Sequence, residues 1–214
     1  MMSKKARANL QRDMDKVLAN LDARWLNAAS SEVVENLNQL LDSISFSDVD
    51  NILAWISHFP GEVDLTSLIE DQLSKRQVFL PRVIGRGEME FVKIDYGWQE
   101  TFEQGFKNIP GPPAATSRSD LFNEEMASKS LIIIPGLAFD PFGNWIGRSF
   151  GYYNKFLVNN DMRKAIKVGV CWSMQIIEQA PPDPFDVYLD FLCTEEQCIS
   201  TDLSHSTSEL FPVE

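Results

Sequence analysis

Apolar residues in the first forty positions recur at intervals of three and four, which is the spacing of an amphipathic helix. A first set comprises Leu10, Met14, Val17, Leu18, Leu21 and Trp25. A second set comprises Val33, Val34, Leu37, Leu40 and Leu41. The polar stretch 27–31 separates them, and Ser31 is a residue type that caps helix starts. The pattern therefore predicts two helices with a break at residues 27–31.

Beyond residue 50, short apolar runs alternate with one more stretch of helical spacing, over residues 65–73. Residues 89–94 alternate weakly, as an edge strand does. Runs that suit strands buried on both faces occupy residues 52–56, 78–80, 131–134, 165–172 and 187–193. The second run is expected to stop at Pro81, because proline cannot donate to a strand ladder. This alternation predicts an α/β fold with helices on both faces of a mostly parallel open sheet.

Two segments fit neither pattern. Residues 105–118 contain Pro110, Pro112 and Pro113, and this loop is long enough to suggest a function. Residues 199–214 are rich in serine and threonine and are expected to form a loosely held tail. No internal repeat or domain boundary is visible, so we expect a single domain over residues 1–214.

Composition excludes several classes of protein. The 214 residues include 19 Lys and Arg against 31 Asp and Glu, a formal net charge of −12. Binding to duplex nucleic acid needs clustered cations, so we expect none. No apolar run approaches the roughly 20 residues of a membrane helix, and the first residues lack the apolar region of a secretory signal. We therefore expect a cytoplasmic protein without membrane contact, which can still hold a small anion through local cations.

The three cysteines, Cys171, Cys193 and Cys198, form no C-x-x-C pair. We expect reduced thiols with neither a disulfide framework nor a zinc site. Cys171 and Cys193 fall in predicted strands and are expected to be inert. The two histidines, His58 and His205, are too few to indicate a metal cluster.

The segment after the strand 131–134 is the strongest candidate for chemistry. Ligands of open α/β sheets bind beyond the carboxyl ends of the strands. Four glycines lie between residues 136 and 151, a helix is expected from Tyr152, and Arg148 and Lys155 add positive charge. Glycines and a helix start together suit a phosphate group. The alternative is an ordinary glycine-rich turn that carries a surface arginine.

This segment resembles the signature of the 5-formyltetrahydrofolate cyclo-ligase family, also called methenyltetrahydrofolate synthetases. The matching residues are Pro135-Gly136-Leu137-Ala138-Phe139-Asp140, Gly147-Arg148 and Gly151-Tyr152-Tyr153. Further blocks in the family's order are Gly61-Glu62-Val63-Asp64, Leu80-Pro81-Arg82-Val83, Gln175, and the run from Asp190 to Glu195. The resemblance covers residues 4 to 196. It implies a three-layer α/β/α sandwich, in agreement with the pattern.

The resemblance also implies a reaction. Such enzymes use MgATP to phosphorylate the formyl oxygen of 5-formyltetrahydrofolate; N10 then closes on the activated carbon, and 5,10-methenyltetrahydrofolate forms as phosphate leaves. Cations must neutralise charge on the transferred phosphoryl group, and the protein must orient the two reacting atoms. The implied ligands are a reduced folate, ATP and Mg²⁺, and we expect a monomer.

Roles follow residue by residue from the same resemblance. Arg148 and Tyr153 are the expected catalytic residues. Glu62, which would accept hydrogen bonds from the pterin ring, and Tyr153 are expected to bind folate. Asn154 and Asp190 are the expected metal ligands. The expected ATP site comprises Lys4, Lys5, Gly147, Arg148, Ser149, Phe150, Gly151, Tyr152 and Lys155.

Several positions depart from the family loop, which usually reads G-x-R-L-G-R-G-(G or K)-G-Y-Y-D. Trp145 replaces an arginine, Ser149 a glycine, Phe150 a small or basic residue, and Asn154 an aspartate. Each lost charge-assisted phosphate contact costs about 1.5–3 kcal/mol. A second hypothesis is therefore a divergent member that binds a folate, another ligand or a partner without turnover, with Trp145 and Phe150 exposed as a contact surface. A relative that handles sugar phosphates or coenzyme A rests on fold analogy alone.

Overall fold

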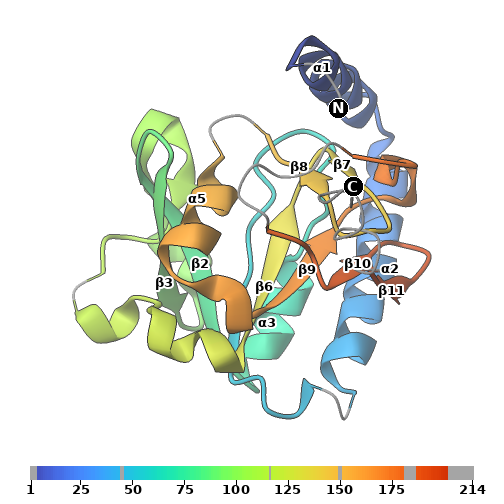
Figure 1. Cartoon of the computed structure of the whole chain (residues 1–214). Helices are drawn as coiled ribbons and strands as arrows, with labels where there is room; N and C mark the ends of the chain where they lie inside the picture. The colour runs from blue at the N-terminus through green and yellow to red at the C-terminus, as the bar shows by residue number, and fades with distance from the viewer. Residues whose placement is uncertain (1–3, 44–45, 116, 149–150, 181–186, 202–214) are drawn as a thin grey trace, which may run out of the picture.

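The computed structural model of the chain describes residues 4–43, 46–115, 117–148, 151–180 and 187–201. Its centre is a seven-stranded sheet in the order β11-β10-β9-β6-β1-β2-β3 (Figure 1). The inner pairs β10/β9, β9/β6, β6/β1 and β1/β2 are parallel, whereas β3 and β11 join the two edges antiparallel. The predicted mostly parallel open sheet is therefore confirmed.

The strands of this sheet range from three residues in β1 to nine in β2. Their bounds are β1 Asn51–Leu53, β2 Gln77–Gly85, β3 Glu88–Ile94, β6 Ser130–Pro135, β9 Ile166–Val170, β10 Phe191–Cys193 and β11 Cys198–Ser200. Two small antiparallel pairs lie outside it: β4 Glu103–Gln104 with β5 Pro110–Gly111, and β7 Ala138–Phe139 with β8 Trp145–Ile146. The strand 131–134 and the edge strand 89–94 are found where the pattern predicts them.

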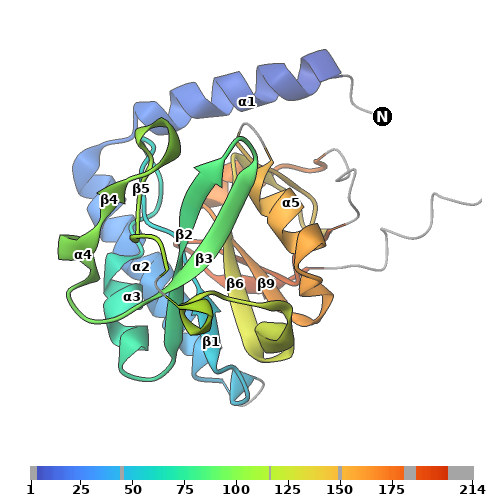
Figure 2. The same ribbon diagram turned by 90° about the vertical axis from the view of Figure 1, so that its left-hand side faces the viewer.

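Helices cover both faces of the sheet, which confirms the three-layer arrangement. The α-helices are α1 Lys4–Ala19, α2 Ala23–Leu41, α3 Thr66–Leu73, α4 Trp98–Thr101 and α5 Tyr152–Asn159. The 3₁₀ helices are η2 Phe106–Asn108, η3 Arg118–Asp120, η4 Glu124–Lys129, η5 Met162–Lys164 and η6 Ser173–Gln175. Figure 1 shows α2 and α5 on opposite sides of the sheet, and Figure 2 shows α1 lying across the top of the molecule.

Alternation along the strands divides the core into two layers. In β1, Ile52 packs with α2 and α3, whereas Leu53 packs with α5 on the other face. Neighbouring strand residues point to opposite faces, so each strand supplies both layers. Among the described residues, no helix is both long and apolar enough to cross a membrane.

The predicted helix break is wrong. Helix α2 runs without interruption through residues 27–31, and the chain breaks earlier, at residues 20–22. Asp22, rather than Ser31, caps α2: its Oδ1 accepts hydrogen bonds from the backbone N–H groups of Arg24 and Trp25 at 2.9 and 3.0 Å. Ser31 instead donates its hydroxyl to the carbonyl of Asn27, inside the helix.

Strand β2 also continues through Pro81, contrary to the prediction. Its ladder with β1 ends at Phe79, so Pro81 lies where β2 pairs with β3 and no longer with β1. At that point the missing N–H interrupts no parallel ladder.

Two expectations at the carboxyl end of the chain need correction. Cys193 and Cys198 form a disulfide between β10 and β11, although reduced thiols were expected. Residues 199 and 200 belong to β11, and the Thr201 N–H donates to the carbonyl of Asp190, so the described start of the predicted tail is held by the sheet. Residues 202–214 lie outside the described residues. Cys171 is buried and free, and burial raises the pKa of its thiol, as expected for an inert core residue.

The assignment of the cap can be tested by substitution. Asp22→Ala removes the acceptor for two N–H groups and should lower the free energy of unfolding by about 0.5–2 kcal/mol. Ser31→Ala, at the position predicted from the pattern, should change it by less than about 0.5 kcal/mol. Urea denaturation of both variants measures the difference, and equal losses would contradict the assignment.

Candidate active site

A cavity of about 650 Å³ lies at the carboxyl ends of the parallel strands. The cavity is lined by Trp55, which follows β1, by Pro135, the last residue of β6, and by the second half of β2. Another part of the lining is formed by Trp145, Gly147, Arg148 and residues 151–154, and Asp15 of α1 also lines the cavity. This is the position at which open α/β sheets bind ligands.

The loop between β1 and α3 places Glu62 in this cavity through its neighbour Gly61. Gly61 has φ +75°, and a Cβ there would lie 2.2 Å from the carbonyl oxygen of Leu18. The Gly61 carbonyl accepts a hydrogen bond from the indole Nε1 of Trp172 at 2.7 Å. Glu62 Oε2 in turn accepts from the backbone N–H groups of His58 and Phe59, both at 3.0 Å. The carboxylate is thus fixed by main-chain donors.

Arg148 joins Glu62 from a segment 86 residues away. Its Nε donates to Glu62 Oε1 at 3.2 Å, and its Nη1 donates to Asp15 Oδ1. Its guanidinium carbon lies 4.7 Å from the ring centroid of Phe59, a cation–π contact. Its Nη2 is buried and has no hydrogen-bond partner among the described residues. Two carboxylates therefore engage Nε and Nη1 of Arg148, and neither engages Nη2.

Tyr153 and two tryptophans supply further buried donors. Within the described part of the chain, the Tyr153 hydroxyl and the indole nitrogens of Trp55 and Trp145 have no hydrogen-bond partner, and all three residues line the cavity. Burial, and then the charge of Glu62, raise the pKa of Tyr153 well above its usual value, so its phenol stays protonated at neutral pH. Buried donors are normally paired, and this group suits a ligand rich in acceptor atoms.

The Asp of the Pro135–Asp140 motif has a structural role. Asp140 is fully buried, and its carboxylate accepts from the backbone N–H groups of Phe142, Asn144 and Ala180 at 2.8–3.0 Å. Gln175 donates to the carbonyl of Gly136 at 2.9 Å. These bonds fix the β7–β8 hairpin, and therefore the wall that contains Trp145.

The structure brings most of the predicted site residues together. The cavity is lined by Glu62, Gly147, Arg148, Gly151, Tyr152, Tyr153 and Asn154. Lys5 and Lys155 are exposed and do not line it. Lys4 begins α1, and its side chain is not described. Ser149 and Phe150 lie outside the described residues.

Asp190, which is predicted as a metal ligand, does not line this cavity. Asp190 precedes β10 and so lies at the amino end of the parallel strands, opposite the cavity. Its Oδ2 accepts from the backbone N–H of Lys167 at 2.7 Å and pairs with the Lys167 ammonium at 3.0 Å. Within the described part of the chain, no group of three or more His, Cys, Asp or Glu could hold a metal ion.

Trp145 is buried rather than exposed. It is 1% exposed in β8 and forms part of the cavity wall, so it offers no contact surface for a partner. The sequence patterns also gave no indication of Asp15, Trp55 and Phe59 as cavity residues. Asp15 lies beside the apolar face of the first predicted helix, and only the tertiary contacts show that it meets Arg148.

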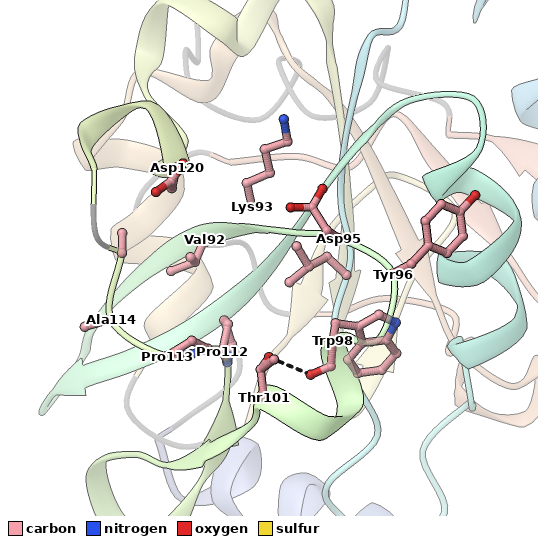
Figure 3. A pocket seen from close by; sticks show the side chains of 12 residues that line it. Val92, Lys93, Asp95, Tyr96, Trp98, Thr101, Pro112, Pro113, Ala114 and Asp120 are labelled. Carbon is pink, nitrogen blue, oxygen red and sulfur yellow. Dashed lines mark hydrogen bonds between the residues drawn. The ribbon is translucent and has the colours of Figure 1, made fainter.

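A second, smaller cavity of about 330 Å³ lies against the edge strand β3 (Figure 3). Lys93, Asp95 and Asp120 line it beside the proline-rich loop. Because Ile94 at the end of β3 pairs with Val78 at the start of β2, this cavity lies at the other end of β2 from the first. It contains no predicted site residue.

The fold and the first cavity define an α/β protein with a cavity of small-molecule size at the carboxyl ends of its parallel strands. The family model of the 5-formyltetrahydrofolate cyclo-ligase family matches residues 3–195, and the chain belongs to this family.

Individual relatives agree with the family assignment. A 5-formyltetrahydrofolate cyclo-ligase of Haemophilus influenzae is 25% identical over 189 residues, which cover 88% of this chain and 97% of the relative. One from Mus musculus is 36% identical over 141 residues, 63% of this chain and 68% of the relative. The NMR structure of the Aquifex aeolicus 5,10-methenyltetrahydrofolate synthetase has a TM-score of 0.73 at 26% identity and covers 97% of this chain and 96% of that protein.

The close approach of Gly61 to α1 gives a testable prediction. Gly61→Ala should lower the free energy of unfolding by more than about 2 kcal/mol, because it combines a positive φ with a clash against Leu18. Gly97→Ala is the matched control: φ is +81°, but no atom lies within 4 Å of the new Cβ. Denaturant unfolding should show a loss of only about 1 kcal/mol for the control. Similar losses would refute the packing argument.

The position of Asp190 gives a second testable prediction. Asp190→Asn should lower the melting temperature, because it leaves the Lys167 ammonium, which is 8% exposed as a residue, without its carboxylate. The Mg²⁺ concentration for half-maximal activity should stay the same. A rise of tenfold or more in that concentration would restore Asp190 as a metal ligand.

Proposed function

We propose that this chain catalyses the ATP-dependent conversion of 5-formyltetrahydrofolate to 5,10-methenyltetrahydrofolate. One observation carries the proposal: Glu62, Arg148 and Tyr153 meet in a single cavity. They do so in a chain that belongs to the cyclo-ligase family.

The apolar part of the cavity suits a reduced folate. Its volume lies within the range of small-molecule sites. Trp55, Ile56, Phe59 and Met89 provide apolar and aromatic surface against which a pterin ring can pack. The fixed Glu62 carboxylate can accept hydrogen bonds from the amino group and ring N–H of the pterin. The protonated Tyr153 phenol can donate to a folate oxygen.

The segment around Arg148 suits the phosphates of ATP. Arg148 lines the cavity, and its Nη2 has no hydrogen-bond partner among the residues that the structure describes. Gly147 and Gly151 allow the backbone to approach a ligand closely. Gly151 has φ +60° and is the N-cap of α5, with no side-chain cap hydrogen bond, so the positive end of the helix dipole lies at the cavity lining, where it favours an anion. Lys107, at the cavity rim, adds a second cation.

A magnesium ion would accompany ATP rather than occupy a protein cage. Mg²⁺ is usually held by one or two protein oxygens together with substrate phosphates. Asn154 is the predicted ligand that lies in the cavity lining, and its amide oxygen fits this role. When bound, the ion would neutralise the charge of the phosphates.

The chemistry then needs little from the protein beyond orientation and charge. The formyl oxygen attacks the γ-phosphorus as the bond to ADP breaks. N10 attacks the activated carbon and loses its proton, and inorganic phosphate leaves with the oxygen. Arg148 stabilises charge on the transferred phosphoryl group, and Glu62 and Tyr153 hold the folate so that N10 faces the formyl carbon.

The alternative of a binder without turnover loses one of its supports. It treated Trp145 and Phe150 as an exposed surface, but Trp145 is buried and Phe150 lies outside the described residues. We therefore favour catalysis, in which Arg148 carries the phosphate contact that Trp145 cannot make.

A direct assay tests the proposal. Protein mixed with MgATP and 5-formyltetrahydrofolate should produce the near-ultraviolet absorbance of the methenyl product. Glu62→Gln should raise the folate KM by about tenfold or more, since a charge-assisted hydrogen bond is lost. Glu70→Gln, on α3 and bonded to Trp98, is the matched control and should retain wild-type kinetics. Absence of product from the wild-type protein at saturating MgATP would reject the proposed function.

A further inference from the structure

Two carboxylates share Arg148, and they are held differently. Glu62 is fixed by two backbone N–H groups, and its side chain is 11% exposed. Asp15 is on α1, and its side chain is 46% exposed. Within the described residues, its one hydrogen-bonded ion pair is with Arg148. Asp15 is therefore the partner that Arg148 can exchange.

The charges around the cavity determine how much the loss of the Asp15 contact would change the binding of an anion at Arg148. Among the described lining residues, the cations Lys107 and Arg148 are balanced by the acids Asp15 and Glu62. With Asp15 in contact, the guanidinium already faces two carboxylates. A polyphosphate would meet little net positive charge there until Asp15 withdraws, and Arg148 binds phosphate best through paired N–H donors.

Helix α1 holds Asp15 over the loop through a second contact on the same face. Gln11, four residues earlier, donates its Nε2 to the carbonyl of Gly147 at 2.9 Å. Gln11 thus contacts Gly147 and Asp15 contacts Arg148, the two residues that the proposed function assigns to phosphate binding. Figure 2 shows α1 as a single straight helix across this end of the molecule.

We propose that Asp15 competes with the phosphates of ATP for Arg148, and that it thereby sets the affinity of the site for nucleotide. The inference rests on the proposed function, because it assigns the anionic ligand of Arg148 to ATP. Asp15 is a positioning residue: it determines whether Arg148 is available and takes no part in the reaction itself.

The experiment compares Asp15→Asn with Asp13→Asn. Asp13 is also on α1, does not line the cavity, and makes a long contact with Arg12 at 3.7 Å. Each variant removes one negative charge from α1, so the comparison separates the contact with Arg148 from a general change in charge. Asp15→Asn should lower the KM for MgATP by about threefold to fivefold, the upper part of the range for loss of a competing, partly exposed ion pair. Asp13→Asn should change it by less than about twofold.

Two further readouts distinguish competition from a structural effect. The KM for 5-formyltetrahydrofolate should not change in Asp15→Asn, because Glu62 keeps its backbone donors. Asp15→Glu, which restores the carboxylate, should return the KM for MgATP towards the wild-type value. An unchanged or higher KM for MgATP in Asp15→Asn would overturn the proposal; a higher value would mean that Asp15 assists nucleotide binding.

Failure of the proposed function can be recognised separately. If the wild-type protein forms no methenyl product, titration with inorganic tripolyphosphate, followed by tryptophan fluorescence, still measures binding at Arg148. Tighter binding to Asp15→Asn than to wild type and Asp13→Asn would support competition without catalysis. Equal binding by all three proteins would reject it.

Discussion

The contact between Gly61 and the carbonyl of Leu18 is the constraint on which the candidate site depends. At this point the end of α1, the loop after β1 and the indole of Trp172 after β9 meet within hydrogen-bond or van der Waals distance. Any side chain at residue 61 would separate α1 from the loop. Because Glu62 follows directly, and Asp15 lies three residues before Leu18, the same contact positions both carboxylates that hold Arg148.

Arg148 shows how a charged residue is kept ready in a partly buried site. A guanidinium removed from water needs partners, and leaving one unpaired is costly. Glu62 and Asp15 pair with the guanidinium in the absence of a ligand. Their negative charges also cancel the positive charge of Arg148 that would attract an anion. A ligand phosphate can take over the role of one acid because the exposed Asp15 regains its hydration when displaced. The fixed Glu62 loses its backbone bonds if it moves, so the two acids are not equivalent.

Local patterns predicted those parts of the fold that are decided locally. The strand 131–134, the edge strand 89–94 and the helix from Tyr152 follow from apolar runs and glycines that need no distant partner. Asp and Ser are both residue types that cap helices. Burial of α2 against the sheet decided that the helix begins after Asp22 and runs through Ser31. The family resemblance assigned Glu62 to the folate and Arg148 to phosphate, but their ion pair was not predicted, since no spacing relates residues 86 positions apart. Asp190 was expected inside a strand over residues 187–193, whereas β10 begins only at Phe191, so its carboxylate lies before the strand and away from the cavity.

The replacement at residue 145 links the departures from the family loop to the arrangement around Arg148. The buried indole of Trp145 supports Gly147 so closely that a Cβ there would lie 3.0 Å from the ring. An arginine in this wall would need an acidic partner, whereas the indole packs with the aromatic core of β2, β3 and α5. The wall is therefore stable without a charge, but it offers an anion one cation fewer. Under the proposed function, Arg148 would then carry a larger share of phosphate binding, and a residue that occupies its donors, as Asp15 does, would have a correspondingly larger effect on nucleotide affinity.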